Sequence, residues 1–85
     1  MGRLLARSSR AFMRGVLGNT TLTTQTPFTV IRDAVAADES EVDPVRKTLA
    51  VMVKQKHLSV IGDGDTATYQ LTASGEELLN ALGGA

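Results

Sequence analysis

The side chains of this chain that are most able to do chemistry are basic ones, placed at helical spacing in two segments. The first set is Arg3, Arg7, Arg10 and Arg14. The second set is Arg46, Lys47, Lys54 and Lys56, with the small Ala50 in its middle. Because Lys and Arg bind phosphate oxygens, each set is a candidate for contact with nucleic acid or with another acidic surface.

Other kinds of chemistry lack the residues that they need. There is no cysteine, so a disulfide and a thiolate metal site are excluded, and with His57 as the only histidine a His-rich metal site has no second member. We find no catalytic constellation in the sequence. We interpret His57 as a helix-end residue. The acidic segment 38–43 lacks the glycine and the spacing of a calcium loop, so we interpret its carboxylates as helix-start residues. The sequence therefore predicts a protein that is not an enzyme and has no metal, no cofactor and no small-molecule site.

The net charge of zero hides a strong asymmetry along the chain. The chain has nine basic and nine acidic side chains. Four of the nine basic ones lie in residues 1–18, which hold no acidic residue, and the other five share residues 19–85 with all nine acidic ones. Such asymmetry is typical of proteins that bind nucleic acid or membranes, and also of a basic arm that docks on an acidic body.

Residues 1–18 are predicted to form a basic amphipathic helix, an arm outside the main domain. Its apolar positions gather on one side and are Leu5, Phe12, Met13, Val16 and Leu17. This side needs burial, so we expect the helix to pack at a dimer or assembly contact, while its arginines could still face DNA phosphates or a membrane surface. An arginine-rich, acid-free amino terminus also resembles a mitochondrial presequence.

The stretch 19–25 is rich in threonine and has no apolar face, so it is either a linker or an extended segment that adds a strand. Thr26 before Pro27 then predicts a helix start, with that helix running to about Ala37. Asp43 before Pro44 repeats the same signal for a second helix that reaches about Lys56. The apolar positions of this second helix would be buried and leave its basic residues on the opposite side; they are Val45, Leu49, Met52 and Val53.

The last third of the chain predicts a hairpin and one more helix. Residues 58–61 and 66–71 have the pattern of strands, and Gly62-Asp63-Gly64-Asp65 between them has turn chemistry. Thr72 would cap the final helix, which runs from Ala73 to about residue 82 and ends at Gly83-Gly84. No apolar run approaches the roughly 18 residues that span a bilayer, so we expect a soluble chain without membrane contact.

This order of elements resembles the winged helix-turn-helix domains of MarR-like and PadR-like transcriptional regulators. The resemblance is strongest in the string Tyr69-Gln70-Leu71-Thr72-Ala73-Ser74-Gly75-Glu76-Glu77-Leu78-Leu79. Their hairpin commonly ends in a Tyr-x-Leu-Thr-x-x-Gly pattern that enters a helix. Residues 45–58 resemble their recognition helix. The resemblance covers residues 26–82 and implies a mainly α fold with a small β-hairpin, so residues 26–85 are predicted to be a winged-helix domain preceded by the basic helix.

The chain departs from these regulators in two places. They usually place a short helix and a turn before the recognition helix, whereas only residues 38–43 separate the two strong helices here, so we expect the positioning helix to be shortened or absent. The family also usually has glycine where this chain has Lys56-His57. We therefore expect an altered helix end, with His57 as the candidate for the left-handed conformation.

The resemblance implies a dimeric transcriptional regulator that contacts duplex DNA through helix 44–56. The implied DNA-binding residues are Arg46, Lys47, Ala50, Lys54 and Lys56, and the implied wing residues are Gly62, Asp63, Gly64 and Thr66. Because Asp63 and Asp65 would repel phosphate, we expect little contact between the wing and DNA. A prokaryotic or phage protein of the cytoplasm is expected, with a mitochondrial location as the alternative.

A second hypothesis is an interaction module, or an accessory subunit of a larger assembly, that is anchored by the basic amino-terminal helix. The neutral net charge and the acidic wing favour this hypothesis. Under either hypothesis, a second copy or a protein partner would bind through the amino-terminal or the carboxy-terminal helix.

Overall fold

The computed structural model describes the backbone of residues 2–83 and the side chains of residues 10–83. The elements are α1 (Gly2–Gly18), β1 (Thr26–Pro27), α2 (Phe28–Val35), α3 (Val42–Lys54), β2 (Leu58–Ile61), β3 (Thr68–Leu71) and α4 (Ala73–Gly83). Single 3-10 turns at Glu39–Glu41 and Gly64–Thr66 precede α3 and β3. The described residues are therefore mainly helical with a small antiparallel sheet, as expected from the sequence.

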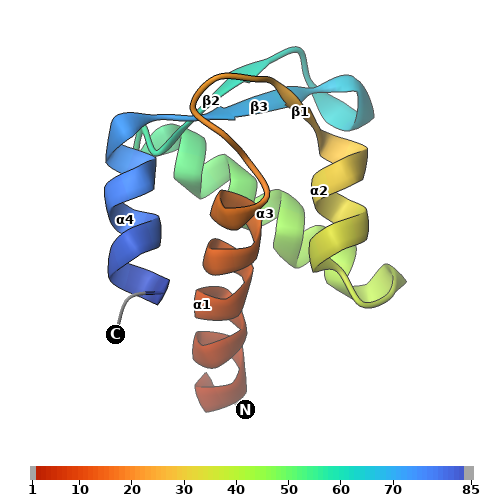
Figure 1. The fold of residues 1–85 in the computed structure, drawn as a ribbon. Helices are drawn as coiled ribbons and strands as arrows, with labels where there is room; N and C mark the ends of the chain where they lie inside the picture. The colour runs from red at the N-terminus through yellow and green to blue at the C-terminus, as the bar shows by residue number, and fades with distance from the viewer. Residues whose placement is uncertain (1, 84–85) are drawn as a thin grey trace.

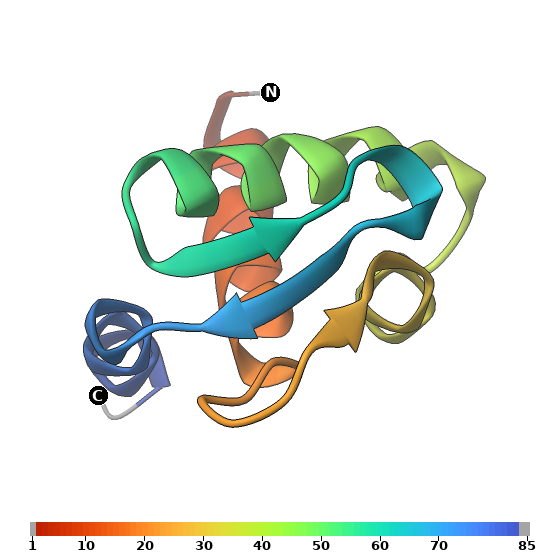
Figure 2. The same cartoon turned by 90° about the horizontal axis from the view of Figure 1, so that it is seen from above.

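The three-stranded sheet lies at one end of the helices, with strand order β1-β3-β2. Helices α1, α2 and α4 extend away from the sheet in Figure 1, and α3 crosses behind α1. When the molecule is seen from above in Figure 2, α2 and α4 are viewed nearly end-on while α3 lies across the picture. Helix α3 thus crosses the other helices, so it has one side toward them and one side toward solvent.

The predicted hairpin is present, and the two residues directly before α2 add a third strand. The first hairpin strand has the predicted bounds, but the second begins at Thr68 because residues 64–66 form a 3-10 turn. Thr26 pairs with Tyr69, and Pro27 pairs with Thr68. The backbone N–H of Leu71 also donates to the carbonyl of Thr21, at 2.8 Å. The residues before α2 are therefore bound along the edge of β3.

The prediction that Thr26 caps α2 was wrong. Pro27 occupies the cap position without a side-chain hydrogen bond, and the N–H of Phe28 donates to the carbonyl of Ala67 at 2.9 Å. Pairing with β3 holds Thr26 in a strand, so its hydroxyl is not placed over the first turn of the helix. Helix α2 also ends at Val35, two residues before the predicted end at Ala37.

Helix α3 begins one residue before the predicted cap Asp43, because the turn that leads into it starts earlier. The Asp38 carboxylate accepts a hydrogen bond from the N–H of Ser40 at 2.8 Å and so begins the 3-10 turn that continues into the helix. Asp43 and Pro44 consequently lie in the first helical turn. Proline is tolerated there because no intrahelical N–H is needed.

The end of α3 differs from the prediction in both its position and its left-handed residue. The helix ends at Lys54, and Lys56, not His57, has a positive φ of 67°. The N–H of Lys56 donates to the carbonyl of Val53, and that of His57 donates to the carbonyl of Met52. This is the Schellman arrangement, in which the left-handed position is usually glycine.

The predicted start of α4 is confirmed, and it joins the end of α3 closely. The Thr72 hydroxyl accepts from the N–H of Gly75 at 3.0 Å and donates to the carbonyl of Lys56 at 2.7 Å. A Cβ atom on Gly75 would overlap the carbonyl oxygen of His57 and lie 2.8 Å from a methyl carbon of Leu71. The glycine of the Thr-x-x-Gly string is therefore required by a backbone contact between α4 and the turn after α3.

Helix α1 belongs to the same hydrophobic core as the rest of the chain. The core residues are Phe12, Val16, Leu17, Phe28, Ile31, Val45, Leu49, Met52, Leu58 and Leu71. Three of these come from α1, and Val16 and Leu17 are fully buried. The prediction that residues 1–18 form an arm outside the domain therefore needs correction, because the described apolar side chains of α1 pack against the rest of the same chain. Leu5 lies outside the residues whose side chains are described.

If α1 is part of the core, Leu17→Ala should destabilise the whole chain. We expect the free energy of unfolding to fall by about 2 to 5 kcal/mol, because the change removes a fully buried side chain and leaves a cavity. Leu22→Ala is the matched control, since Leu22 is 40 % exposed and its loss should cost no more than about 0.5 kcal/mol. Urea denaturation measures both values, and equal small effects would contradict the role of α1.

Candidate nucleic-acid interface

The solvent side of α3 carries two of the basic residues that the sequence singled out, Lys47 and Lys54. Lys47, Ala50 and Lys54 are exposed, while Val45, Leu49 and Met52 on the opposite side are buried. Because positions 47, 50 and 54 are three and four residues apart, they lie in one row along the helix. We call this row, with the exposed Val51 beside it, the α3 outer face; Val51 is 45 % exposed and was not singled out from the sequence.

Lys56 is exposed as well, but it lies beyond the end of the helix. Its left-handed backbone turns the chain away from the α3 axis and toward β2. Thus Lys56 does not continue the row of the α3 outer face, although it adds a positive charge near the carboxyl end of α3, where cations are favourable.

Arg46 does not project freely into solvent, contrary to the expectation that it lies with Lys47 and Lys54 on the outer face. Its Nη2 donates to Oδ1 of Asp65 at 2.5 Å, and its side chain is 40 % exposed. Its guanidinium carbon lies 4.3 Å from the centre of the Phe28 ring, within the range of a cation–π contact. Arg46 therefore links α3 both to the hairpin turn and to the start of α2.

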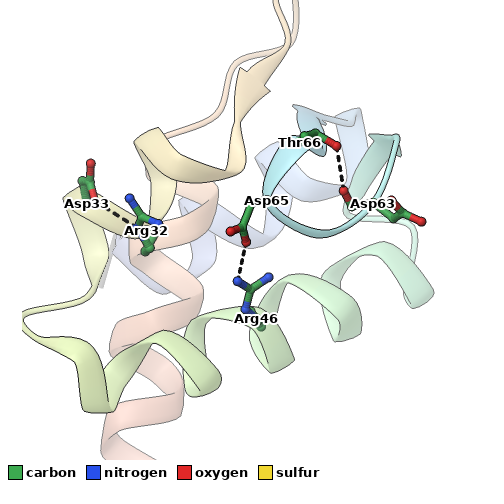
Figure 3. A network of polar contacts seen from close by, with 6 residues as sticks. All are labelled: Arg32, Asp33, Arg46, Asp63, Asp65 and Thr66. Atoms are coloured by element: carbon green, nitrogen blue, oxygen red, sulfur yellow. Dashed lines mark hydrogen bonds and ion pairs between the residues drawn. The ribbon is translucent and has the colours of Figure 1, made fainter.

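A second arginine approaches the same place from α2. The guanidinium carbon of Arg32 lies 6.0 Å from the centre of the Phe28 ring, and its Nε donates to Asp33 at 3.0 Å. Figure 3 shows the Asp65 side chain pointing from the hairpin turn toward Arg46, with Arg32 on the neighbouring helix. The arrangement brings two guanidinium groups and carboxylates together in a polar hollow lined by Arg32, Asp33, Ala36, Asp38, Glu39, Val42, Arg46 and Asp65.

The predicted wing residues form a tight, exposed turn. Gly62 and Gly64 have φ values of 83° and 59°, which favour glycine, and the Thr66 hydroxyl donates to the carbonyl of Asp63 at 3.0 Å. Asp63 and Asp65 are both exposed. The structure separates their roles, because Asp65 is bound to Arg46 while Asp63 contributes its carbonyl to the turn.

The arginines of α1 whose side chains are described lie on a different helix from the α3 outer face. Arg10 and Arg14 are exposed, and Arg14 lines a shallow groove between α1 and α4 together with Gly15 and Leu79. Arg3 and Arg7 lie outside the residues whose side chains are described. Arg14 thus faces the groove between α1 and α4, away from the row of Lys47, Ala50 and Lys54.

The remaining candidates have local structural partners. Nδ1 of His57 lies 2.8 Å from the Ser74 hydroxyl at the start of α4. The acidic segment serves the turn before α3, since Asp38 accepts from Ser40 and the Glu41 carboxylate accepts from the N–H of Ala37. Among the described residues, no group of His, Cys, Asp and Glu is arranged to hold a metal ion, and no helix is long and apolar enough to cross a membrane.

Comparisons with protein-family models, with curated proteins and with solved structures gave no match to this chain. Its site must therefore be judged from its own geometry. The geometry offers a basic row on one exposed helix, an acidic turn beside it, and an arginine that joins the two.

Arg46 perturbs the titration of Asp65. Its hydrogen bond and its positive charge lower the pKa of the Asp65 carboxyl, and Arg32 adds to the effect. A lowered folded-state pKa means that the ionised carboxylate stabilises the fold above its ordinary pKa, and that this contribution is lost as the pH falls through the lowered value.

Arg46→Gln should therefore raise the pKa of Asp65 toward its ordinary value. Carbon NMR of the Asp65 carboxyl during an acid titration measures the shift directly. Arg14→Gln removes the same charge from the α1–α4 side and should leave the Asp65 titration unchanged. An Asp65 midpoint that does not respond to Arg46→Gln would show that the ion pair is absent in solution.

Proposed function

We propose that this chain is a small winged-helix protein that binds duplex DNA through the α3 outer face. The observation that carries the proposal is the row formed by Lys47, Ala50 and Lys54, exposed along a helix whose other side is buried in the core. A basic helix with a small residue in its middle can approach the major groove closely, with its lysines on the flanking phosphates.

The order of elements supports a winged-helix arrangement better than the sequence alone did. Helix α2 and the turn at residues 36–41 directly precede α3, so in this proposal α2 is the positioning helix that the sequence predicted to be shortened or absent. Helix α1 then serves as the first helix, and the hairpin of β2 and β3 follows α3 as the wing.

The chemistry of the outer face suits moderate and largely sequence-independent affinity. Lys47 and Lys54 are point charges suited to phosphate oxygens, whereas Ala50 and Val51 present methyl groups that could contact a thymine methyl. Two lysine contacts in each chain give few released counterions, so the proposed form is a homodimeric transcriptional regulator in which two copies double these contacts.

Lys47→Ala and Lys54→Ala should each weaken duplex binding and reduce the slope of log affinity against log salt by about one. Fluorescence anisotropy with a labelled duplex at several salt concentrations measures both quantities. Arg14→Ala is the matched control, because it removes one positive charge from the α1–α4 side and should leave the slope nearly unchanged. Absence of binding by the wild-type chain at low salt would refute the proposal.

A second candidate function is protein binding, and the exposed apolar side chains near the hairpin favour it. Ile61 and Val60 on β2 are 63 % and 38 % exposed, and Val51 lies among the lysines of α3. The DNA titration also separates the two functions, since a protein-interaction module would bind no duplex at low salt. The proposed anchor at α1 is less favoured, because its apolar side is already occupied by the core.

A further inference from the structure

The contact between Arg46 and Asp65 joins α3, the helix that is proposed to bind DNA, to the turn of the wing. The two residues are 19 positions apart and approach through a single hydrogen-bonded ion pair. Both side chains remain open to water, at 40 % and 62 % exposure. An ion pair this exposed is weak, because water and salt screen it, so an incoming anion can compete for the arginine.

Arg46 is also held so that it stays in place when its carboxylate partner leaves. The face of the buried Phe28 ring lies 4.3 Å below its guanidinium and limits where the group can move. Arg46 immediately precedes Lys47 and lies one helical turn from Ala50, so it borders the α3 outer face. A guanidinium binds carboxylate and phosphate oxygens through the same pair of N–H donors.

Asp65, whose carboxylate binds Arg46, lies in the turn through which a DNA-binding wing would contact the phosphate backbone of the duplex. Asp65 lies in the exposed turn at residues 64–66, and Figure 3 shows its carboxylate between the turn and α3. A carboxylate in this position neutralises the arginine and also repels a phosphate that approaches it.

We propose that Asp65 is a built-in competitor of the DNA backbone: its carboxylate occupies the Arg46 guanidinium that a phosphodiester group of duplex DNA would otherwise bind. Binding of DNA replaces the Asp65–Arg46 ion pair with a phosphate–Arg46 pair and releases the turn at residues 64–66 from Arg46. This inference rests on the proposed DNA binding and adds a regulatory contact to it. It also accounts for an acidic wing beside a basic helix.

The test compares two wing variants that remove the same charge. Asp65→Asn should tighten binding to a labelled duplex by about threefold to tenfold at low salt, because one repulsion is removed and Arg46 is released. Asp63→Asn removes a charge from the same turn without touching Arg46, so its gain should stay below about twofold. Far-ultraviolet circular dichroism and thermal unfolding check that each variant is folded, and Asp65→Ser provides a second replacement.

A double-mutant cycle shows whether the gain passes through Arg46. When Arg46→Gln is already present, Asp65→Asn should improve affinity no more than Asp63→Asn does, since the released group is missing. Equal gains from Asp65→Asn and Asp63→Asn in the wild-type background would overturn the inference while leaving DNA binding in place. No binding by any of these proteins at low salt would overturn the proposed function and this inference together.

Discussion

Helix α3 has one apolar side, and α1 supplies part of the surface that buries it. Phe12, Val16 and Leu17 of α1 lie in one core with Val45, Leu49 and Met52 of α3. A chain of 85 residues has little apolar surface to spare, so this shared core constrains where every other element can lie. It also decides which side of α3 faces water, and that side carries Lys47 and Lys54.

The distribution of charge follows from this packing. The basic row of α3 lies on a different surface from Arg10 and Arg14 of α1, because the two helices turn their apolar sides toward the same core. Arg46 lies at the edge of that core, where the Phe28 ring and the Asp65 carboxylate meet it. The acidic side chains of the hairpin turn predicted little contact between the wing and DNA. One of them, Asp65, instead forms an ion pair with Arg46 inside the same chain.

Local patterns in the sequence predicted local features well. The Thr72 cap of α4 and the first hairpin strand each depend on residues close in the chain. The failures depend on distant partners: Thr26 is held by β3, and Arg46 by a turn 19 residues later. Residues 1–18 were predicted to be an arm for the same reason. Their periodicity shows that one side of the helix must be buried, but it does not show which element buries it.

The central claim is that the α3 outer face is the surface that meets DNA. Amide chemical-shift mapping by NMR, with a short duplex added to the isotopically labelled chain at low salt, tests it most directly. The account predicts the largest changes along residues 47–54, with little change at Arg14 and Leu79 on the α1–α4 side. Changes confined to the α1–α4 side, or no change along α3, would contradict it.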